Sequence, residues 1–452
     1  MRFSSVVLSL LLTGLSAPVL AWSNHSLGSA LALRDAQGIK DVEAVEVESL
    51  EDFLAAEGAG LQGLLDQQEA FARANFKGYP ARPDALRWMA EGTGNRRQDF
   101  YQALRINPEI KLASFVQPVP GTDDWKDRTR LPIGQVMVFK DFSQWSDRYR
   151  FYVVNPGDKL SPLSVVATAA DEPDYGHDIN LFSDNPGTAG ARYNFGSQPF
   201  GDSRFEYSSQ APFHMGFYHE SPILTTAAPY LAQTYPEQRA YQYFGLARYA
   251  FETGHPYWGY RFLGWGLHYT QDLTQPYHAK VMPGSTTLGL LWVSAKDMLG
   301  YPQAKDDVVK RVADRHTALE NFQLAWLGSL LAEGRTDNDM FQAYSDRARD
   351  SGYPVYDAGY LRNTVSAEAY AAADGLDEQI GVWMQSSPAG AGFSSSNKLV
   401  ASSSVDPQMQ ALLVELITHF GAHSRKAVAA TATPMETVSY THLRAHETKA
   451  KL

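Results

Sequence analysis

The 452-residue sequence contains no cysteine. Disulfide bonds therefore cannot hold this protein together, and any metal ion must be bound by nitrogen and oxygen ligands. The chain also lacks a run of basic residues, and its formal net charge is −11 at pH 7. A chain with this charge balance is not expected to bind nucleic acid by neutralising phosphates, nor to dock electrostatically on anionic membranes.

Long apolar segments are missing as well. Residues 1–21 carry Arg2, an apolar run from Val6 to Leu15 and a small-residue site that ends at Ala21, which is the pattern of a secretory signal peptide. That run is too short to cross a bilayer, and no later stretch of about 18 uninterrupted apolar residues follows. We therefore expect a soluble, secreted protein, extracellular or periplasmic, whose mature chain begins at Trp22.

The composition is that of a globular protein, with 44% hydrophobic and 12% aromatic residues. Helical periodicity dominates, while residues 132–142 and 147–157 are β-branched and aromatic runs typical of strands or extended segments. We predict a mainly α protein with one domain over residues 22–430, in which residues 36–165 form an inserted α/β or extended elaboration. Residues 437–452 resemble a translated sequencing-adaptor tail and are excluded from this fold.

The stretch 255–282 carries the clearest chemistry. His268 and Asp272 are four residues apart, so a helix presents them on one face. Pro276 is expected to end that helix just before Tyr277 and to turn His278 back toward the same site. A single pair of this kind is more often a surface ion pair.

A second pair, His316 and Glu320, has the same spacing on a predicted long amphipathic helix over 306–334. Two such pairs, together with a histidine behind a helix-breaking proline, favour metal binding. Zinc is the first metal to consider for these ligands.

Further ligand candidates lie in two other places. A helix predicted from His25 to about Arg34, capped by Asn24 or Ser23, puts His25 in its first turn, where an incidental polar residue is the simpler interpretation. The loop-rich stretch 165–220 can supply ligands to a helical scaffold, although turn chemistry explains much of its composition. Its candidates are Asp171, Asp174, His177, Asp178, His214 and His219.

Residues 288–301 form a hydrophobic stretch with two interpretations. A buried helix is the preferred one. The alternative is an exposed apolar surface near the site that meets lipid.

These motifs together resemble the bacterial zinc-dependent phospholipases C. That family has the block H-Y-x-G-D-x-x-x-P-x-H after an aromatic helix, followed by H-x-x-x-E-N-F; this chain has HYTQDLTQPYHA and RHTALENF. Mature members begin with tryptophan, as Trp22 would. The match is strong over about 245–325 and plausible over 170–220. One departure is Gln271, where the family usually has glycine.

The resemblance implies a helical core of this phospholipase type and three zinc ions per chain. One ion would be held by Asp174, His214, His268 and Asp272. A second would share Asp272 and take His25 with the amino nitrogen and carbonyl oxygen of Trp22. The third would be held by His278, His316 and Glu320. Asp174 is chosen because the family has an Asp-Tyr pair there; Asp171 and Asp178 are weaker candidates, and His219 is an alternative to His214.

The implied reaction is hydrolysis of a phospholipid, with phosphatidylcholine the expected substrate, at a membrane or micelle surface. Asp174 would orient or deprotonate the attacking water, and Tyr175 and Phe213 could contact a choline headgroup. No obligate protein partner is evident. The related three-zinc single-strand nucleases are disfavoured because they typically have aspartate where this chain has Glu320, and because a basic stripe is missing. A secreted metal-binding or lipid-binding protein without turnover is the third hypothesis.

Overall fold

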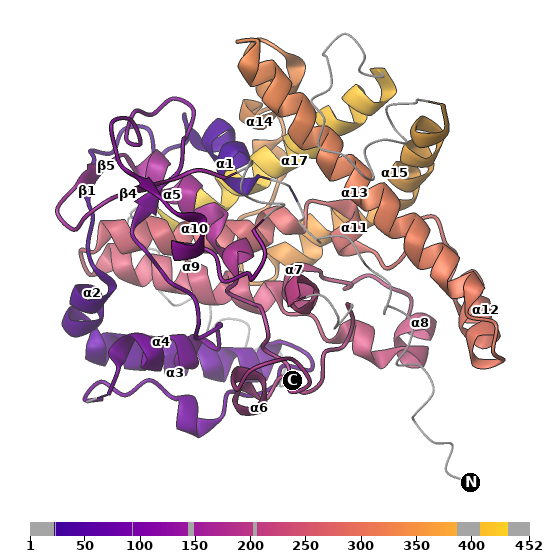
Figure 1. Ribbon diagram of the computed structural model, residues 1–452, viewed down its shortest axis with the longest axis horizontal. Helices are drawn as coiled ribbons and strands as arrows, with labels where there is room; N and C mark the ends of the chain where they lie inside the picture. The colour runs from indigo at the N-terminus through magenta and orange to yellow at the C-terminus, as the bar shows by residue number, and fades with distance from the viewer. Residues whose placement is uncertain are drawn as a thin grey trace, which may run out of the picture.

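The computed structural model describes residues 22, 24–92, 94–142, 149–201, 206–386 and 407–432. It is built mainly of helices with two small sheets, which confirms the predicted mainly α class (Figure 1). The predicted signal peptide and the tail at 437–452 lie outside the described residues. The α-helices are α1 (His25–Leu33), α2 (Leu50–Ala56), α3 (Gly58–Asn75), α4 (Arg96–Leu104), α5 (Pro162–Ala170), α6 (Ala189–Tyr193), α7 (Ala211–His214), α8 (Pro222–Ala227), α9 (Pro236–Glu252), α10 (Pro256–Asp272), α11 (Pro276–Ala279), α12 (Thr287–Met298), α13 (Gln303–Ala332), α14 (Asp339–Ser345), α15 (Ala367–Ser386) and α17 (Pro407–Thr431).

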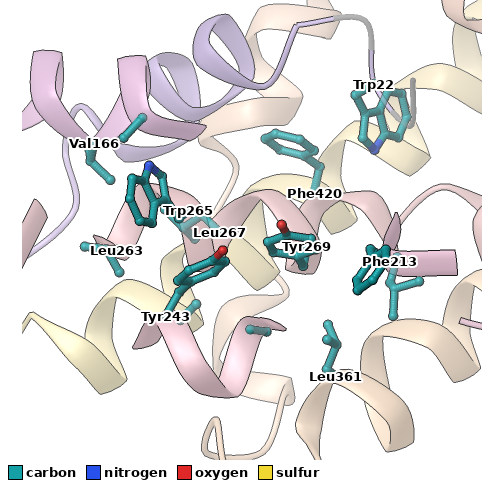
Figure 2. Close-up of a cluster of buried hydrophobic side chains, with 14 of the residues drawn as sticks. Trp22, Val166, Phe213, Tyr243, Leu263, Trp265, Leu267, Tyr269, Leu361 and Phe420 are labelled. Atoms are coloured by element: carbon teal, nitrogen blue, oxygen red, sulfur yellow. The ribbon is translucent and has the colours of Figure 1, made fainter. Parts of the chain in front are cut away.

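The centre of the molecule is α10, which is buried from Tyr257 to Asp272. Helices α5, α9 and α17 pack against it, so it is covered on several sides, as expected for a helix that is apolar nearly all round (Figure 1). Figure 2 shows Trp265, Leu267 and Tyr269 of α10 among the surrounding core side chains. The helix is therefore a rigid scaffold for the polar residues at its carboxyl end.

That carboxyl end differs from the sequence prediction. Helix α10 ends at Asp272, and Pro276 is the first residue of the short helix α11. Proline is favoured at this first position because its missing N–H would have no partner within the helix. The side chain of Gln275 caps α11 by accepting from the backbone N–H of Tyr277. Pro276 thus starts the helix that carries His278 and does not itself end α10.

The segment 36–165 is only partly as predicted. Its two ends meet in an antiparallel sheet of β1 (Val45–Glu46) and β5 (Lys159–Leu160). A second antiparallel sheet has the order β2 (Phe115–Val116), β4 (Phe151–Val153) and β3 (Arg130–Leu131). The predicted extended run 147–157 thus contributes β4. The run 132–142 instead contains a 3-10 turn, Ile133–Gln135, and no strand.

Helix α12 covers most of the hydrophobic stretch 288–301 and is not the buried helix that was the preferred interpretation. Only Leu290 and Ser294 of this helix are buried, whereas Leu288, Trp292 and Leu299 are 75%, 61% and 73% exposed. The buried-helix prediction was wrong because α12 packs mainly on one side, against α13. None of the helices in the described ranges is long and apolar enough to cross a membrane.

Candidate metal centre

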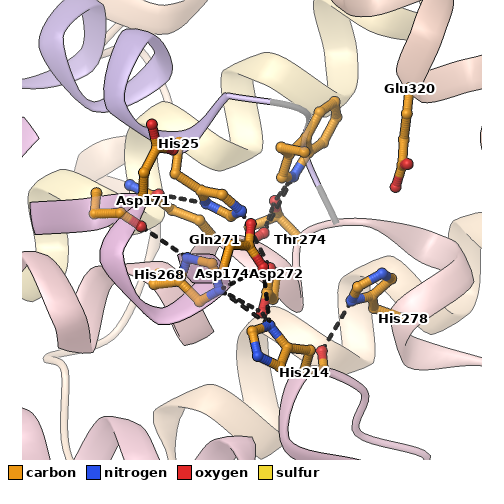
Figure 3. A network of polar contacts seen from close by, with 12 residues as sticks. His25, Asp171, Asp174, His214, His268, Gln271, Asp272, Thr274, His278 and Glu320 are labelled. Atoms are coloured by element: carbon orange, nitrogen blue, oxygen red, sulfur yellow. Dashed lines mark hydrogen bonds and ion pairs between the residues drawn. The ribbon is translucent and has the colours of Figure 1, made fainter. Parts of the chain in front are cut away.

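Three groups of buried side chains in the described part of the chain could each hold a metal ion. We name them the Asp174 group (Asp174, His214 and His268), the His25 group (His25, His268 and Asp272) and the His278 group (His278, His316 and Glu320). Figure 3 shows His25, Asp174, His214, His268 and Asp272 converging between α1, α7 and the carboxyl end of α10, with His278 and Glu320 to one side. The sequence-predicted ligands from segments far apart in the chain therefore come together.

In the Asp174 group, α10 supplies His268, α7 supplies His214 as its last residue, and a 3-10 helix over Glu172–Tyr175 supplies Asp174. His268 Nε2 lies 3.0 Å from His214 Nδ1 and 3.7 Å from Asp174 Oδ1. Asp272 Oδ2 lies beside them, 2.8 Å from His214 Nδ1 and 3.3 Å from His268 Nε2. Four ligands around one zinc ion at its usual bond lengths are about 3.3 Å apart, so these separations fit such an ion.

The His25 group is built on the same carboxylate. His25 is the first residue of α1, and its Nε2 lies 3.3 Å from Asp272 Oδ1. The start of α1 is fixed by Asn24, one of the two predicted caps, whose side chain accepts from the backbone N–H of Leu27. Asp272 turns one oxygen toward His25 and the other toward His214 and His268. This is the geometry of a bridging ligand.

The His278 group joins α11 to the middle of α13. His316 and Glu320 lie one turn apart on α13, with His316 Nε2 2.7 Å from Glu320 Oε1. The rings of His278 and His316 meet edge to face with centroids 5.2 Å apart. A small cavity of about 20 Å³, lined by His316 and mainly apolar side chains, reaches this group and has room for about one water molecule.

Neighbouring carbonyl groups fix the ring orientation of two histidines. His268 Nδ1 lies 2.7 Å from the carbonyl oxygen of Ala170, and His278 Nδ1 lies 2.8 Å from that of His214. A carbonyl oxygen only accepts, so each Nδ1 carries the proton and each Nε2 presents a lone pair to its group. This carbonyl–histidine arrangement is typical of metal ligands.

Buried polar atoms that make no hydrogen bond indicate whether the groups are suited to a metal ion. Among the described residues, Nε2 of His25, His278 and His316 and both carboxylate oxygens of Asp272 are buried and make no hydrogen bond of normal geometry. The close polar contacts that His25, His316 and Asp272 do make through these atoms are to other members of the groups. A buried polar atom left unpaired destabilises a fold by about 1–3 kcal/mol. These atoms all face into the groups, so bound cations would satisfy them.

The pKa values of the candidate ligands differ between the groups, and so does their charge. Burial lowers the pKa of His25 and His214, but the nearby carboxylates, Asp272 foremost, outweigh burial and raise these pKa values to about 9 and about 10. Burial favours the protonated form of Asp272, yet His268 and His214 hold its pKa well below the usual value. Burial dominates at His278 and His316, where it lowers the pKa to about 3. The His278 group is thus ready to bind a cation with neutral imidazoles.

Trp22 reaches the same region from the N-terminal side. Its indole is 2% exposed, and its Nε1 donates to the carbonyl oxygen of Gln271 at 3.1 Å and to Thr274 Oγ1 at 3.0 Å. The ring also packs edge-on against Phe420 of α17. These contacts anchor Trp22 beside the His25 group; coordination through its amino nitrogen stays a prediction.

The alternatives from the loop stretch lie elsewhere. His219 Nε2 is 2.8 Å from the carbonyl oxygen of Arg362, outside all three groups, whereas His214 belongs to one of them. Asp178 pairs with the buried guanidinium of Arg239 at 2.7 Å. Asp171 accepts from the backbone N–H of Ser26. Asp178 also lies 3.6 Å from His214, but at Nε2, the ring nitrogen opposite the Nδ1 that contacts Asp272. Of the three acidic candidates, Asp174 is the one that faces both Nε2 of His268 and Nδ1 of His214.

The two residues expected at the headgroup are both buried. The Tyr175 hydroxyl lies 3.2 Å from Asp171 Oδ2 and 3.0 Å from Gln117 Oε1, two acceptors that share its single proton. The Phe213 ring is fully buried and faces the guanidinium of Arg239 at 4.9 Å. Contact of either ring with a substrate stays a prediction.

Comparisons with models of protein families, with curated proteins and with solved structures found no match to this chain. The resemblance to the zinc-dependent phospholipases C therefore stays a prediction from the quoted motifs.

Proposed function

We propose that this protein is a secreted zinc-dependent phospholipase C that hydrolyses the glycerol-side phosphodiester of phospholipids. The observation that carries the proposal is the position of Asp272, whose Oδ1 faces His25 and whose Oδ2 faces His214 and His268, with a third ligand group close by. Clustered cation sites of this kind suit phosphoryl chemistry, in which charge on the phosphate oxygens must be offset. Zinc, when bound, supplies a Lewis acid that acidifies water and offsets that charge.

Asp174 is the proposed proton acceptor. Burial raises the pKa of this carboxyl, which makes its carboxylate a better base than an exposed aspartate. It would take the proton of the water whose oxygen attacks phosphorus. The bond between phosphorus and the glyceryl oxygen then breaks, and solvent water protonates that oxygen to give diacylglycerol and a phosphorylated headgroup.

The proposed partner is a phospholipid surface. We expect it to be contacted by exposed apolar side chains on and just after α12, which we name the α12 ridge (Leu288, Trp292, Met298, Leu299 and Tyr301). These side chains are between 59% and 75% exposed. Helix α12 packs on α13, the helix that carries His316 and Glu320 (Figure 1). Exposed leucine with tryptophan and tyrosine is typical of surfaces that rest at a membrane interface.

The test uses purified protein that begins at Trp22, with phosphatidylcholine vesicles or single-stranded DNA, with and without a chelator. We expect release of diacylglycerol and phosphocholine that is lost on chelation and restored by zinc. Asp174→Asn should abolish release, whereas the exposed matched control Asp337→Asn should not. Cleavage of DNA without lipid hydrolysis would instead identify the nuclease, and metal binding without either activity the non-catalytic hypothesis.

A further inference from the structure

Gln271 occupies a position next to the shared carboxylate. It lies in the last turn of α10, directly before Asp272, and its side chain is fully buried. The related phospholipases usually have glycine at this position, so their pattern assigns no role to a side chain there. A buried amide must satisfy two donors and an acceptor, which makes its contacts informative.

The contacts of Gln271 join three helices. Its Nε2 lies 2.7 Å from Ser29 Oγ of α1 and 3.1 Å from Ser424 Oγ of α17. Its Oε1 lies 2.9 Å from His25 Nδ1. The two N–H donors thus meet two hydroxyl oxygens. The acceptor oxygen faces His25 (Figure 3).

This arrangement decides which nitrogen of His25 keeps its proton when the ring is neutral, as it must be to bind a cation. An amide oxygen only accepts, so His25 Nδ1 must donate to it. His25 Nε2 then faces Asp272 Oδ1 at 3.3 Å, inside the His25 group. Backbone carbonyls perform the same task for His268 and His278. At His25 the acceptor that holds the proton on Nδ1 is a side-chain oxygen, that of Gln271.

We propose that Gln271 is a positioning residue that holds the proton of His25 on Nδ1 and so directs the Nε2 lone pair into the His25 group. The proposal rests on metal binding at that group and deepens the proposed function without depending on turnover. It gives a role to the side chain that departs from the family pattern. Outer partners of this kind typically change metal affinity about 10- to 100-fold when removed.

The experiment compares Gln271→Leu, which removes the acceptor, with Gln271→Glu, which keeps a side-chain oxygen at the same length. Zinc affinity is measured by chelator competition in the protein that begins at Trp22, without lipid. We expect Gln271→Leu to weaken one zinc site about 10- to 100-fold and leave the others unchanged. Gln271→Glu should keep that site within a few fold of wild type.

Histidine ¹⁵N NMR of the zinc-loaded protein supplies a second readout, because it reports which ring nitrogen carries the proton. We expect the His25 Nδ1–H form in the wild type. The matched control is Gln68→Leu, which removes a buried amide that donates to the carbonyl oxygen of Gln242, away from the groups. It should lower stability without changing zinc affinity.

Unchanged zinc affinity in Gln271→Leu, or a proton on Nε2 of His25 in the zinc-loaded wild type, would overturn the proposal. If Gln271→Leu fails to fold, the NMR result on the wild type decides. Both readouts are independent of lipid hydrolysis, so an inactive protein with the expected zinc and NMR results would contradict the proposed function and leave this inference standing.

Discussion

Asp272 is buried completely and has three histidines around it, His25, His214 and His268. A carboxylate in such a place is stable only if nearby positive charge offsets the loss of hydration. Protonated histidines can provide that charge in the metal-free protein, and cations can provide it when bound. The residue therefore links the protonation of the site to its metal content.

Replacing Asp272 should affect more than one ion. Asp272→Asn removes a charge that faces both the Asp174 and the His25 groups, so we expect the zinc content of the purified protein to fall at both. Glu320→Gln should lower it at the His278 group alone. Elemental analysis of zinc per chain checks this. Equal losses in the two variants would contradict the bridging role of Asp272.

Because His177 is buried, we expect the stability of the protein to depend on pH. Its ring is buried edge-on against Trp265 with centroids 4.6 Å apart, and burial lowers its pKa from 6.5 to about 3. Between these pH values the unfolded chain binds a proton that the folded protein does not. The free energy of unfolding therefore falls as pH drops below about 6.5, by up to about 1.4 kcal/mol per pH unit.

The variant His177→Leu should lose this contribution. Urea unfolding at pH 7 and pH 5 gives the stability of each protein, and wild type should lose more than the variant on acidification. Equal losses would show that His177 does not titrate as its burial implies.

At the scale of helices, the contact between α5 and α10 depends on Gly264. A Cβ atom there would lie 2.5 Å from Ala169 Cβ and 2.6 Å from the carbonyl oxygen of Val166. Gly264→Ala should therefore push the helices apart and destabilise the protein by about 1–3 kcal/mol. The control Gly63→Ala lies in α3, where the added Cβ would meet nothing within 4 Å beyond the neighbouring backbone of its own helix, so it should stabilise the protein by about 0.5–1 kcal/mol. Thermal unfolding of both variants measures the difference.

Helix α12 allows a test of the proposed lipid contact. Leu288→Ser combined with Trp292→Ser should weaken binding to phosphatidylcholine vesicles in a sedimentation assay, because these side chains are exposed and apolar. Zinc content should not change. Val355→Ser removes a similarly exposed apolar side chain from another part of the surface and serves as the control. Vesicle binding that is equal in all proteins would contradict a role for the α12 ridge.

For the whole molecule, the three groups join segments that are distant in the sequence. Ligands come from α1, from the 3-10 helix after α5, from α7, α10 and α11, and from α13. A cation that binds only the folded state stabilises it by about 2.7 kcal/mol at a concentration about one hundred times its dissociation constant. We therefore expect chelation to lower the unfolding temperature and added zinc to restore it, as measured by calorimetry. An unfolding temperature that chelation leaves unchanged would contradict occupancy of these groups.

Local sequence patterns were sufficient to predict several features of the fold and the candidate site. The spacing of His268 and Asp272, and of His316 and Glu320, placed each pair on one helix face, because about 3.6 residues per turn fixes that geometry without reference to the rest of the chain. Asn24 as a helix cap was equally local, since its side chain satisfies an N–H three residues away. The apolar composition of α10 likewise agrees with its burial.

Other features could not be predicted from local sequence, because they depend on contacts between residues that are far apart in the chain. Asp171, Asp174 and Asp178 lie close together in the sequence, and only the packing of their turn against α10, α9 and the N-terminal helix decided that Asp174 faces the histidines. The same holds for His214 over His219. No local pattern revealed that Gln271 contacts His25 across 246 residues of sequence.

The sequence by itself determined the ligand types, since a chain without cysteine offers only nitrogen and oxygen, and it determined which residues share a helix face. Only the tertiary structure decided which of these faces meet, that α10 ends at Asp272 and that α12 exposes its apolar side. The physical reason is that helix periodicity is set by backbone geometry within a few residues. Burial and orientation are set by contacts between elements that the chain brings together only when it folds.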